Sequence, residues 1–225
     1  MTEPIALLGG TGRSGPGLAL RFSLAGVPVV IGSRERAKGA AAAAEVSARV
    51  GAAGGGAAVT GMDNAVAAAA AGTVLITIPY EGQAALLGEL AATLAGKLVV
   101  STVVPVQVDR TLGPSHIDVP EGSAAEQAAA LLPGARVVAA FHSPSSAILG
   151  RSGRPVDSDV LVTGDDAEAK SRVIELAERL PGVRGIDAGP LRYARYSEQL
   201  TVLLLSINRI HKAHAGVRIT EIPAR

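Results

Sequence analysis

The chain has 225 residues, of which 48% are hydrophobic, so it contains enough apolar material to fold around a real core. Its 21 lysines and arginines nearly balance 20 aspartates and glutamates, and only 2% of its residues are aromatic, which argues against binding to nucleic acid or to an anionic membrane surface. Cysteine is absent, which excludes disulfides and thiolate chemistry and is compatible with a reducing cytoplasm.

Short apolar runs alternate with helical segments along most of the chain. Strands are expected at residues 5–8, 27–31, 58–60, 74–78, 98–101, 136–141 and 159–163. Helices are expected at 15–25, 35–50, 66–71, 83–95, 124–132, 167–180 and 193–213. This alternation predicts an α/β fold, a doubly wound and mainly parallel Rossmann sheet with a small C-terminal helical portion. Neither a signal peptide nor a membrane-spanning helix is expected, which favours a cytoplasmic location.

A glycine-rich loop follows the first expected strand. Residues Gly10-Thr11-Gly12-Arg13-Ser14-Gly15 match the pattern GxGxxG, which is weak alone because the chain holds 27 glycines. The position strengthens it, because the glycines directly follow a buried strand and open a helix. There the backbone can turn tightly and present N–H groups to a pyrophosphate at the positive end of the helix. The sequence therefore predicts a dinucleotide site, although a glycine turn without a ligand has the same pattern.

The end of the second expected strand indicates which dinucleotide is preferred. An NAD-binding domain places an Asp or Glu there for the ribose 2′-hydroxyl, whereas this chain has Ser33 and Arg34. Lys38 follows four residues later, so a hydroxyl and two cations can surround a 2′-phosphate. The pattern favours NADP(H). Alternatively, Arg34, Arg36 and Lys38 are only the solvated start of a helix.

At this point the sequence resembles the NADPH-dependent coenzyme F420 reductase family, also called F420-dependent NADP oxidoreductase. The resemblance covers nearly the whole chain and includes the C-terminal residues 216–219. It is carried by residues 6–12, 17–21, 30–34, 60–62, 77–81, 104–106, 123–126, 164–166 and 187–191. It implies hydride exchange between NADP(H) and coenzyme F420, a deazaflavin, in a compact homodimer.

The resemblance also implies roles for individual residues. Thr11, Gly12, Arg13 and Ser14 would hold the pyrophosphate, and Ser33, Arg34 and Lys38 the 2′-phosphate. Ile78, Pro79 and Tyr80 would lie beside the nicotinamide, since open sheets bind ligands at the carboxyl ends of their strands. Val104 would form part of the wall between the two cofactors, although a strand end before a proline turn has the same pattern.

His142 matches a histidine near the deazaflavin pocket of that family. Binding is favoured over catalysis for His142, because hydride transfer needs no protein nucleophile. Ser143 and Ser146 fall where deazaflavin contacts are expected, in a stretch, 143–146, that departs from the family pattern. Residues 1–150 are interpreted as the NADP-binding Rossmann domain. Residues 151–225 would complete the cofactor and substrate pocket and form the dimer interface.

Two other functions remain open from the residues alone. One is an NADP-dependent reductase of a small carbonyl or imine substrate, for which Tyr193 and Tyr196 are the best proton donors because Lys97 and Lys170 are expected at the surface. The other is a non-catalytic module that senses NADP(H). No metal site is expected, because the four histidines are scattered and lack obvious carboxylate partners.

Overall fold

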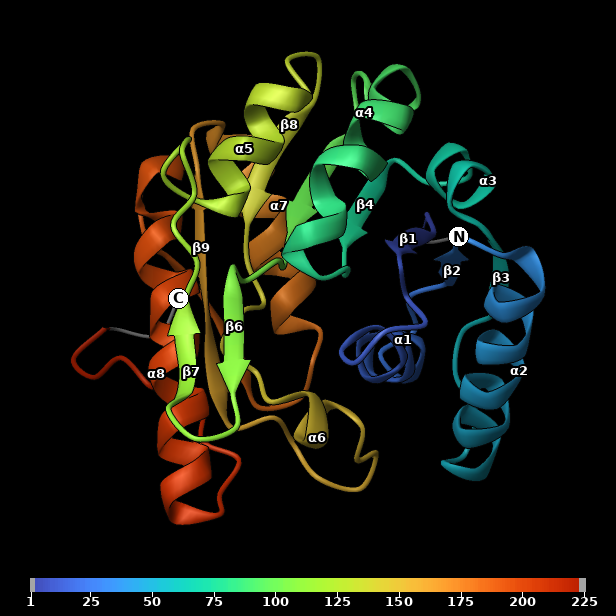
Figure 1. The fold of residues 1–225 in the computed structure, drawn as a ribbon. Helices are drawn as coiled ribbons and strands as arrows, with labels where there is room; N and C mark the ends of the chain where they lie inside the picture. Colours follow the sequence, from blue (N-terminus) through green and yellow to red (C-terminus); the bar gives the residue numbers. More distant parts are fainter. Residues whose placement is uncertain (1–2, 223–225) are drawn as a thin grey trace.

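The computed structural model describes residues 3–222. One eight-stranded sheet, in the order β10-β9-β8-β5-β4-β1-β2-β3, forms the centre of the molecule (Figure 1). Every neighbouring pair is parallel except β8 and β9. The expected doubly wound, mainly parallel Rossmann sheet is therefore confirmed.

The elements follow one another along the chain with short connections. The sheet strands are β1 (Ile5–Leu8), β2 (Val29–Ser33), β3 (Val59–Asp63), β4 (Thr73–Ile76), β5 (Leu98–Ser101), β8 (Arg136–Ala139), β9 (Ser158–Gly164) and β10 (Val183–Asp187). A separate hairpin consists of β6 (Val106–Asp109) and β7 (Gly113–His116). The helices are α1 (Gly15–Leu24), α2 (Arg36–Ala52), α3 (Asn64–Ala69), α4 (Gln83–Leu94), α5 (Ala124–Leu131), α6 (Ser146–Leu149), α7 (Ala167–Glu178) and α8 (Ala194–His211). Two 3₁₀ turns, η1 (Tyr80–Gly82) and η2 (Leu191–Tyr193), precede α4 and α8.

Helices cover both faces of the sheet. Alternate strand residues point to opposite faces, so Leu7 belongs to the core layer that includes residues of α1, α2, α6 and α7. Leu8 belongs to the layer on the other face, with residues of α3, α4, α5 and α8. Strands buried on both faces read as continuous apolar runs, which explains why they stand out in the sequence. None of the helices within residues 3–222 is both long and apolar enough to cross a membrane.

The topology fixes where a ligand can bind. The chain moves from β1 outward to β2 and β3, then crosses back to β4 on the other side of β1. Ligands of open α/β sheets bind at such a reversal, outside the carboxyl ends of the strands. Strand β9 extends past this edge, because only its last residues, Thr163 and Gly164, pair with β8. The C-terminal part therefore forms a wall beyond the carboxyl edge of the parallel strands.

Several elements were not expected from the sequence. Hairpin β6–β7, strand β10 and the one-turn helix α6 are all short, and two of their strands contain glycine or proline, which strands disfavour. In β10, Gly185 lies so close to α7 that an added Cβ would stand 2.8 Å from a side-chain carbon of Ile174. Packing against α7 rather than intrinsic strand preference therefore forms β10.

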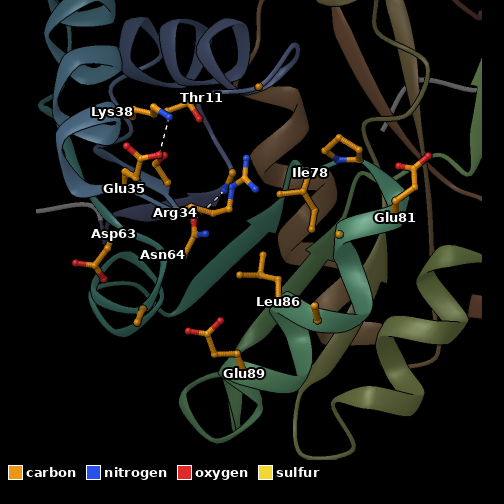
Figure 2. A pocket seen from close by; sticks show the side chains of 17 residues that line it. Thr11, Arg34, Glu35, Lys38, Asp63, Asn64, Ile78, Glu81, Leu86 and Glu89 are labelled. Atoms are coloured by element: carbon orange, nitrogen blue, oxygen red, sulfur yellow. Dashed lines mark hydrogen bonds and ion pairs between the residues drawn. The ribbon is translucent and has the colours of Figure 1, made fainter.

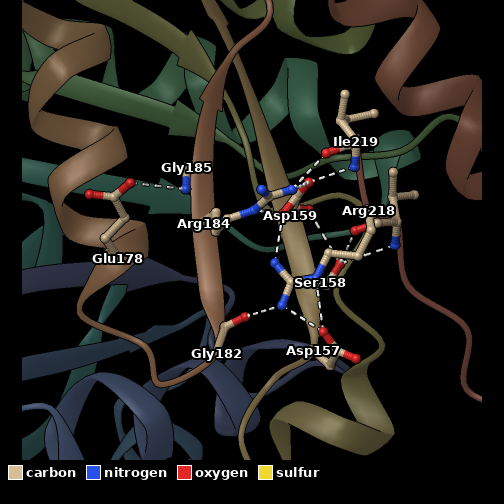
Figure 3. Close-up of polar contacts among 10 residues, drawn as sticks. Asp157, Ser158, Asp159, Glu178, Gly182, Arg184, Gly185, Arg218 and Ile219 are labelled. Carbon is tan, nitrogen blue, oxygen red and sulfur yellow. Dashed lines mark hydrogen bonds and ion pairs between the residues drawn. The ribbon is translucent and has the colours of Figure 1, made fainter. Parts of the chain in front are cut away.

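A buried carboxylate holds the C-terminal segment against the sheet (Figure 3). Asp159 of β9 is fully buried and accepts hydrogen bonds from Arg184 at 2.6 and 2.8 Å, from Arg218 at 2.7 Å and from the Ile219 N–H at 2.7 Å. The Asp159 N–H donates to the Val217 carbonyl at 2.6 Å. Burial acts to raise the pKa of Asp159, but these hydrogen bonds outweigh it and the pKa falls to about 2. We call this group the Asp159 clasp.

Candidate functional site

The glycine loop forms a tight turn between β1 and α1. An added Cβ on Gly15 would overlap the backbone of Gly10, so only glycine permits this close approach. Gly10 makes the turn, Gly12 is exposed at the cavity described below, and Gly15 packs the helix on the loop. This division of roles is the one that dinucleotide-binding glycines have. Because Pro16 stands in the first turn and Ser14 makes no capping hydrogen bond through its side chain, the positive end of α1 is open to an anion.

A cavity of about 760 Å³ lies at the carboxyl edge of the sheet, where the strand order reverses (Figure 2). Seven of the residues expected in the cofactor site line it: Thr11, Gly12, Ser33, Arg34, Lys38, Ile78 and Pro79. They come from the glycine loop, the end of β2, the start of α2 and the end of β4. The fold thus gathers residues nearly 70 positions apart in sequence around one space large enough for a sizeable ligand.

One end of the cavity carries the hydroxyl and cations expected to hold a 2′-phosphate. Ser33 is 3% exposed, whereas Arg34 and Lys38 are open to solvent. Lys38 Nζ lies 2.6 Å from a carboxylate oxygen of Glu35, the residue just before α2, and this pairing lowers the pKa of Glu35. Both side chains are more than 60% exposed, and such surface pairs are weak. Lys38 can therefore exchange this partner for a phosphate group.

Other cavity residues were missed by the sequence interpretation. Asn64 is 7% exposed and its side-chain oxygen accepts the Gly9 N–H at 3.1 Å, which fixes the glycine loop against α3. Its neighbour Asp63 caps α3 by accepting the Val66 N–H at 2.9 Å. Leu86 and Glu89 of α4 lie across the cavity from Lys38 (Figure 2). The capping pattern of Asp63 was a visible signal in the sequence, but the partnership of Asn64 with a loop 55 residues away was not.

Polar side chains without partners mark a second region, at the ends of β5, β8 and β9. Ser101, His142, Ser143 and Thr163 are each at most 8% exposed. A buried polar atom of each, Ser101 Oγ, His142 Nε2, Ser143 Oγ and Thr163 Oγ1, makes no hydrogen bond within the described structure. Ser101 and Thr163 flank Ala139 of β8 in the strand register, and His142 and Ser143 follow that strand. Each unsatisfied buried group costs about 1–3 kcal/mol, which a polar ligand arriving here could offset.

His142 is neutral and its ring has a defined hydrogen-bonding role. Burial lowers the pKa of His142 to about 4. Its Nδ1 lies 3.4 Å from Ser197 Oγ, and the Ser197 hydroxyl donates to the Ala194 carbonyl at 2.9 Å. We therefore assign the neutral tautomer with the proton on Nδ1, in which the Ser197 oxygen accepts a long hydrogen bond from Nδ1–H and Nε2 is an acceptor. In this state His142 cannot donate to a ring carbonyl through Nε2.

The remaining expected residues lie outside the cavity. Arg13 is exposed and Ser14 half-buried at the start of α1. The Tyr80 hydroxyl, in η1, accepts from Gln127 of α5 at 3.2 Å. Val104, after β5, and Ser146, the first residue of α6, are both half-buried.

Comparison with known proteins shows the family to which the chain belongs. Residues 4–105 match the family model described as NADP oxidoreductase coenzyme F420-dependent. The chain is 42% identical to the F420-dependent NADP reductase of Methanothermobacter thermautotrophicus, over 99% of this chain and 97% of that relative. It is 44% identical to the F420-dependent NADP reductase of Methanothermobacter marburgensis, over 97% of this chain and 99% of that relative. The chain belongs to the F420-dependent NADP reductase family.

A solved structure extends this relationship to the fold. An Arthrobacter sp. FB24 protein assigned as an F420-dependent NADP-reductase superposes with a TM-score of 0.80 at 27% identity, over 97% of this chain and all of that one. The resemblance inferred from the sequence motifs is thereby confirmed. Membership of the F420-dependent NADP reductase family makes the protein an oxidoreductase. Within residues 3–222, no group of three or more His, Cys, Asp or Glu side chains is placed to hold a metal ion.

Proposed function

We propose that this protein transfers hydride between NADP(H) and coenzyme F420. The observation that carries the proposal is the identity of 42–44%, along almost the whole chain, to relatives named F420-dependent NADP reductase. The cavity geometry supports it independently, because a glycine turn, a helix N-terminus and a cationic end stand in the order in which a dinucleotide with a 2′-phosphate presents its groups.

NADP(H) would be held by three parts of the described cavity. The turn at Thr11 and Gly12 and the N-terminal end of α1 face the pyrophosphate, with Gly10 shaping the turn. Ser33, Arg34 and Lys38 surround the 2′-phosphate, since guanidinium and ammonium groups form strong charge-assisted hydrogen bonds with phosphate. Ile78 and Pro79, at the end of β4, flank the nicotinamide.

Coenzyme F420 would lie against the second region, beside the end of β8. The unsatisfied polar atoms of His142, Ser143 and their neighbours support this, because a heteroaromatic ring carries both N–H donors and carbonyl acceptors. Val104 and Ser146 would border the same site. Tyr80, on η1, would lie beside the nicotinamide. Since Nε2 of His142 is an acceptor, its proposed role is to receive a hydrogen bond from a ring N–H, not to relay a proton.

The chain's own part in the reaction is to bind, orient and exclude water. The two cofactors supply the hydride donor and acceptor, so no protein nucleophile is needed. Apolar side chains such as Ile78 and Val104 exclude water from the reacting faces. The two binding regions meet along one sheet edge, which brings the reactants together without any acid–base residue.

The decisive experiment mixes purified protein, NADPH and F420 and follows the loss of the deazaflavin's visible absorbance. Bleaching with NADPH and much slower bleaching with NADH are expected. Tight NADPH binding without bleaching, measured by fluorescence titration, would contradict the F420 assignment and favour an NADP(H)-sensing module.

A reductase of small carbonyl or imine substrates is less well supported. Its best proton donors, Tyr193 and Tyr196, do not line the NADP cavity, although the pocket that they line also includes Thr163 of the second region. Both rings are largely open to solvent, at 41% and 62% exposure. Replacement of either tyrosine by Phe is expected to leave F420 reduction in place.

We also propose a cytoplasmic homodimer in which residues 151–225 complete the pocket and supply the interface. Tyr196, Leu203 and Ile210 are each more than half exposed and recur every seven residues on α8, so they form one apolar stripe. Hairpin β6–β7 extends the surface with Val108 and Leu112, which are 68% and 88% exposed. An exposed apolar patch of this kind is typical of a protein–protein interface.

A further inference from the structure

Two arginines hold four consecutive backbone carbonyls in the segment that contains α6. Arg21 of α1 donates from Nε to the Leu149 carbonyl at 3.0 Å and from Nη2 to the Ile148 carbonyl at 2.9 Å, and also to the carbonyl of Arg151. Arg49 of α2 donates to the remaining carbonyl, that of Gly150. We call these two side chains the arginine clamp.

The clamp places two cations at the C-terminal end of the one-turn helix α6. The negative end of the helix dipole lies there and favours cations, and the Ile148 carbonyl also accepts the Arg151 N–H at 3.0 Å. Arg21 is only 3% exposed, and within residues 3–222 it forms no ion pair with a carboxylate. Burial lowers the pKa of Arg21 from its ordinary value. A buried guanidinium paired only with carbonyls is expensive to desolvate, so its presence indicates a specific requirement at this position.

Helix α1 also contacts other residues of the segment 141–151. Gly17 of α1 lies so close to α6 that an added Cβ would stand 2.9 Å from the Cβ of Leu149. The ring of Phe22 packs edge-on against Phe141 with centroids 5.7 Å apart. Phe141 has a φ of 62°, in the left-handed region that non-glycine residues rarely adopt. Contacts from α1 thus hold both ends of residues 141–151.

Helix α1 therefore links two sites. Its N-terminus follows the glycine loop directly, and its second half carries Gly17, Arg21 and Phe22. A helix of 10 residues is rigid, so the pyrophosphate loop and the segment bearing His142, Ser143 and Ser146 have a fixed relative position.

We propose that Arg21 and Arg49 are positioning residues for the second cofactor: they fix segment 141–151 against α1, and thereby set the deazaflavin site relative to the NADP site. This inference rests on the proposed function. Neither arginine touches the reacting atoms, so each acts through the backbone it holds. Loss of the clamp should weaken productive F420 binding and leave NADPH binding intact.

The test compares Arg21→Met, Arg21→Lys and Arg49→Met with a matched control. The control is Lys97, whose Nζ also donates to backbone carbonyls, those of Ala68 and Ala71, at 2.6 and 2.8 Å. These carbonyls lie at and just after the C-terminal end of α3, away from the clamp. The Lys97→Met variant therefore reports a loss of stability without loss of the clamp.

We expect Arg21→Met and Arg49→Met to raise the KM for F420 about tenfold, because small displacements of a positioning segment have large kinetic effects. The Kd of NADPH, measured by fluorescence titration, should change less than about twofold, because the glycine loop is unaltered. Arg21→Lys should rescue the KM partly, since an ammonium retains the charge but not the planar fork. Lys97→Met should lower Tm without changing the KM for F420.

Hydrogen–deuterium exchange gives a second readout that needs no activity. Amides of residues 141–151 should exchange faster in both Arg→Met variants and remain protected in Lys97→Met. An unchanged KM and unchanged exchange in folded Arg21→Met and Arg49→Met would overturn the inference, as would a parallel loss of NADPH affinity. Failure of the wild-type protein to reduce F420 would instead contradict the proposed function, and the exchange experiment would still decide whether the clamp orders the segment.

Discussion

At the scale of single residues, the cations proposed to bind the 2′-phosphate of NADP(H) lie at the end of β2. Arg34 lines the cavity, is exposed, and is free to place its planar guanidinium against a phosphate. Glu35, the next residue, lines the same cavity and is paired with Lys38. We therefore expect discrimination between the dinucleotides to depend on Arg34.

Replacement of Arg34 by Ala should weaken NADPH binding roughly 10- to 100-fold, because a charge-assisted hydrogen bond to phosphate is lost. NADH binding should change by less than about threefold, since NADH has no 2′-phosphate. Fluorescence titration measures both constants. Arg36→Ala is the control, because Arg36 is an exposed cation at the start of the same helix that does not line the cavity. Equal losses for both dinucleotides would contradict this assignment.

The buried, neutral ring of His142 leads to a prediction about pH dependence. With a pKa near 4, it stays neutral in the folded protein between about pH 5 and 8, so it should contribute no ionisation to the pH–rate profile there. In the unfolded chain its pKa is about 6.5, so stability is fully present above that pH and is lost as the pH falls toward 4. His142→Asn should remove this part of the acid sensitivity in urea unfolding. A rate-controlling ionisation near pH 6.5 that disappears in His142→Asn would show the prediction to be wrong.

At the scale of elements, one buried carboxylate joins α8 to α5. Glu198 is fully buried and accepts the N–H groups of Ala124 and Ala125, at the start of α5, at 3.0 and 3.1 Å. Burial raises the pKa of Glu198 to about 7, even though these hydrogen bonds favour the ionised form. Near neutral pH the group is therefore partly protonated and still occupies the positive end of α5.

Glu198→Ala should lower the free energy of unfolding by about 2–3 kcal/mol, because two buried N–H groups lose their acceptor. Gln199→Ala, at the exposed next position of the same helix, should change it by less than about 0.5 kcal/mol. Urea unfolding at neutral pH measures both values. Equal effects of the two substitutions would mean that Glu198 does not dock α8.

At the scale of the whole molecule, the Asp159 clasp closes the C-terminal segment onto β9. Because the pKa of Asp159 falls from 3.8 to about 2 on folding, its contribution is present above about pH 4 and is lost as the pH falls through 2. Asp159→Asn should therefore destabilise the protein by about 2 kcal/mol at pH 7, and this difference from wild type should shrink below about pH 3. Asp157→Asn is the control, since Asp157 also pairs with Arg218 but its side chain is 85% exposed. A difference that is independent of pH would argue against an ionic clasp.

The proposed homodimer predicts the mass of the assembly in solution. Leu203→Glu combined with Ile210→Glu should halve the mass measured by sedimentation, because two charges would enter an apolar interface. Val66→Glu is the control, since Val66 is an exposed apolar residue, at 43%, on α3. A wild-type protein that sediments as a monomer would contradict the proposal.

The local sequence by itself predicted most strands and helices of the sheet and the cationic end of the NADP cavity. The strands at 5–8 and 98–101 have the bounds expected from their apolar runs, and the glycine loop and its helix lie where their pattern predicts. Ser33, Arg34 and Lys38 are separated by at most five positions at one strand end, so their clustering needs little tertiary information. Lys97 and Lys170, expected at the surface, are half-buried, and their ammonium groups donate to carbonyls of α3 and to Asp187, respectively.

Only the tertiary structure decided the partners of the buried charges. Arg21 meets α6 across as many as 128 residues, Arg49 meets Gly150 across 101, and Glu198 meets α5 across 74. No local pattern encodes these pairs, because each depends on which helix the sheet order places beside which loop. The same holds for β10 and hairpin β6–β7, whose short sequences have weak strand preference and are formed by their neighbours. Periodicity and turn chemistry act over a few residues, whereas burying a charge requires a partner that only the assembled fold can supply.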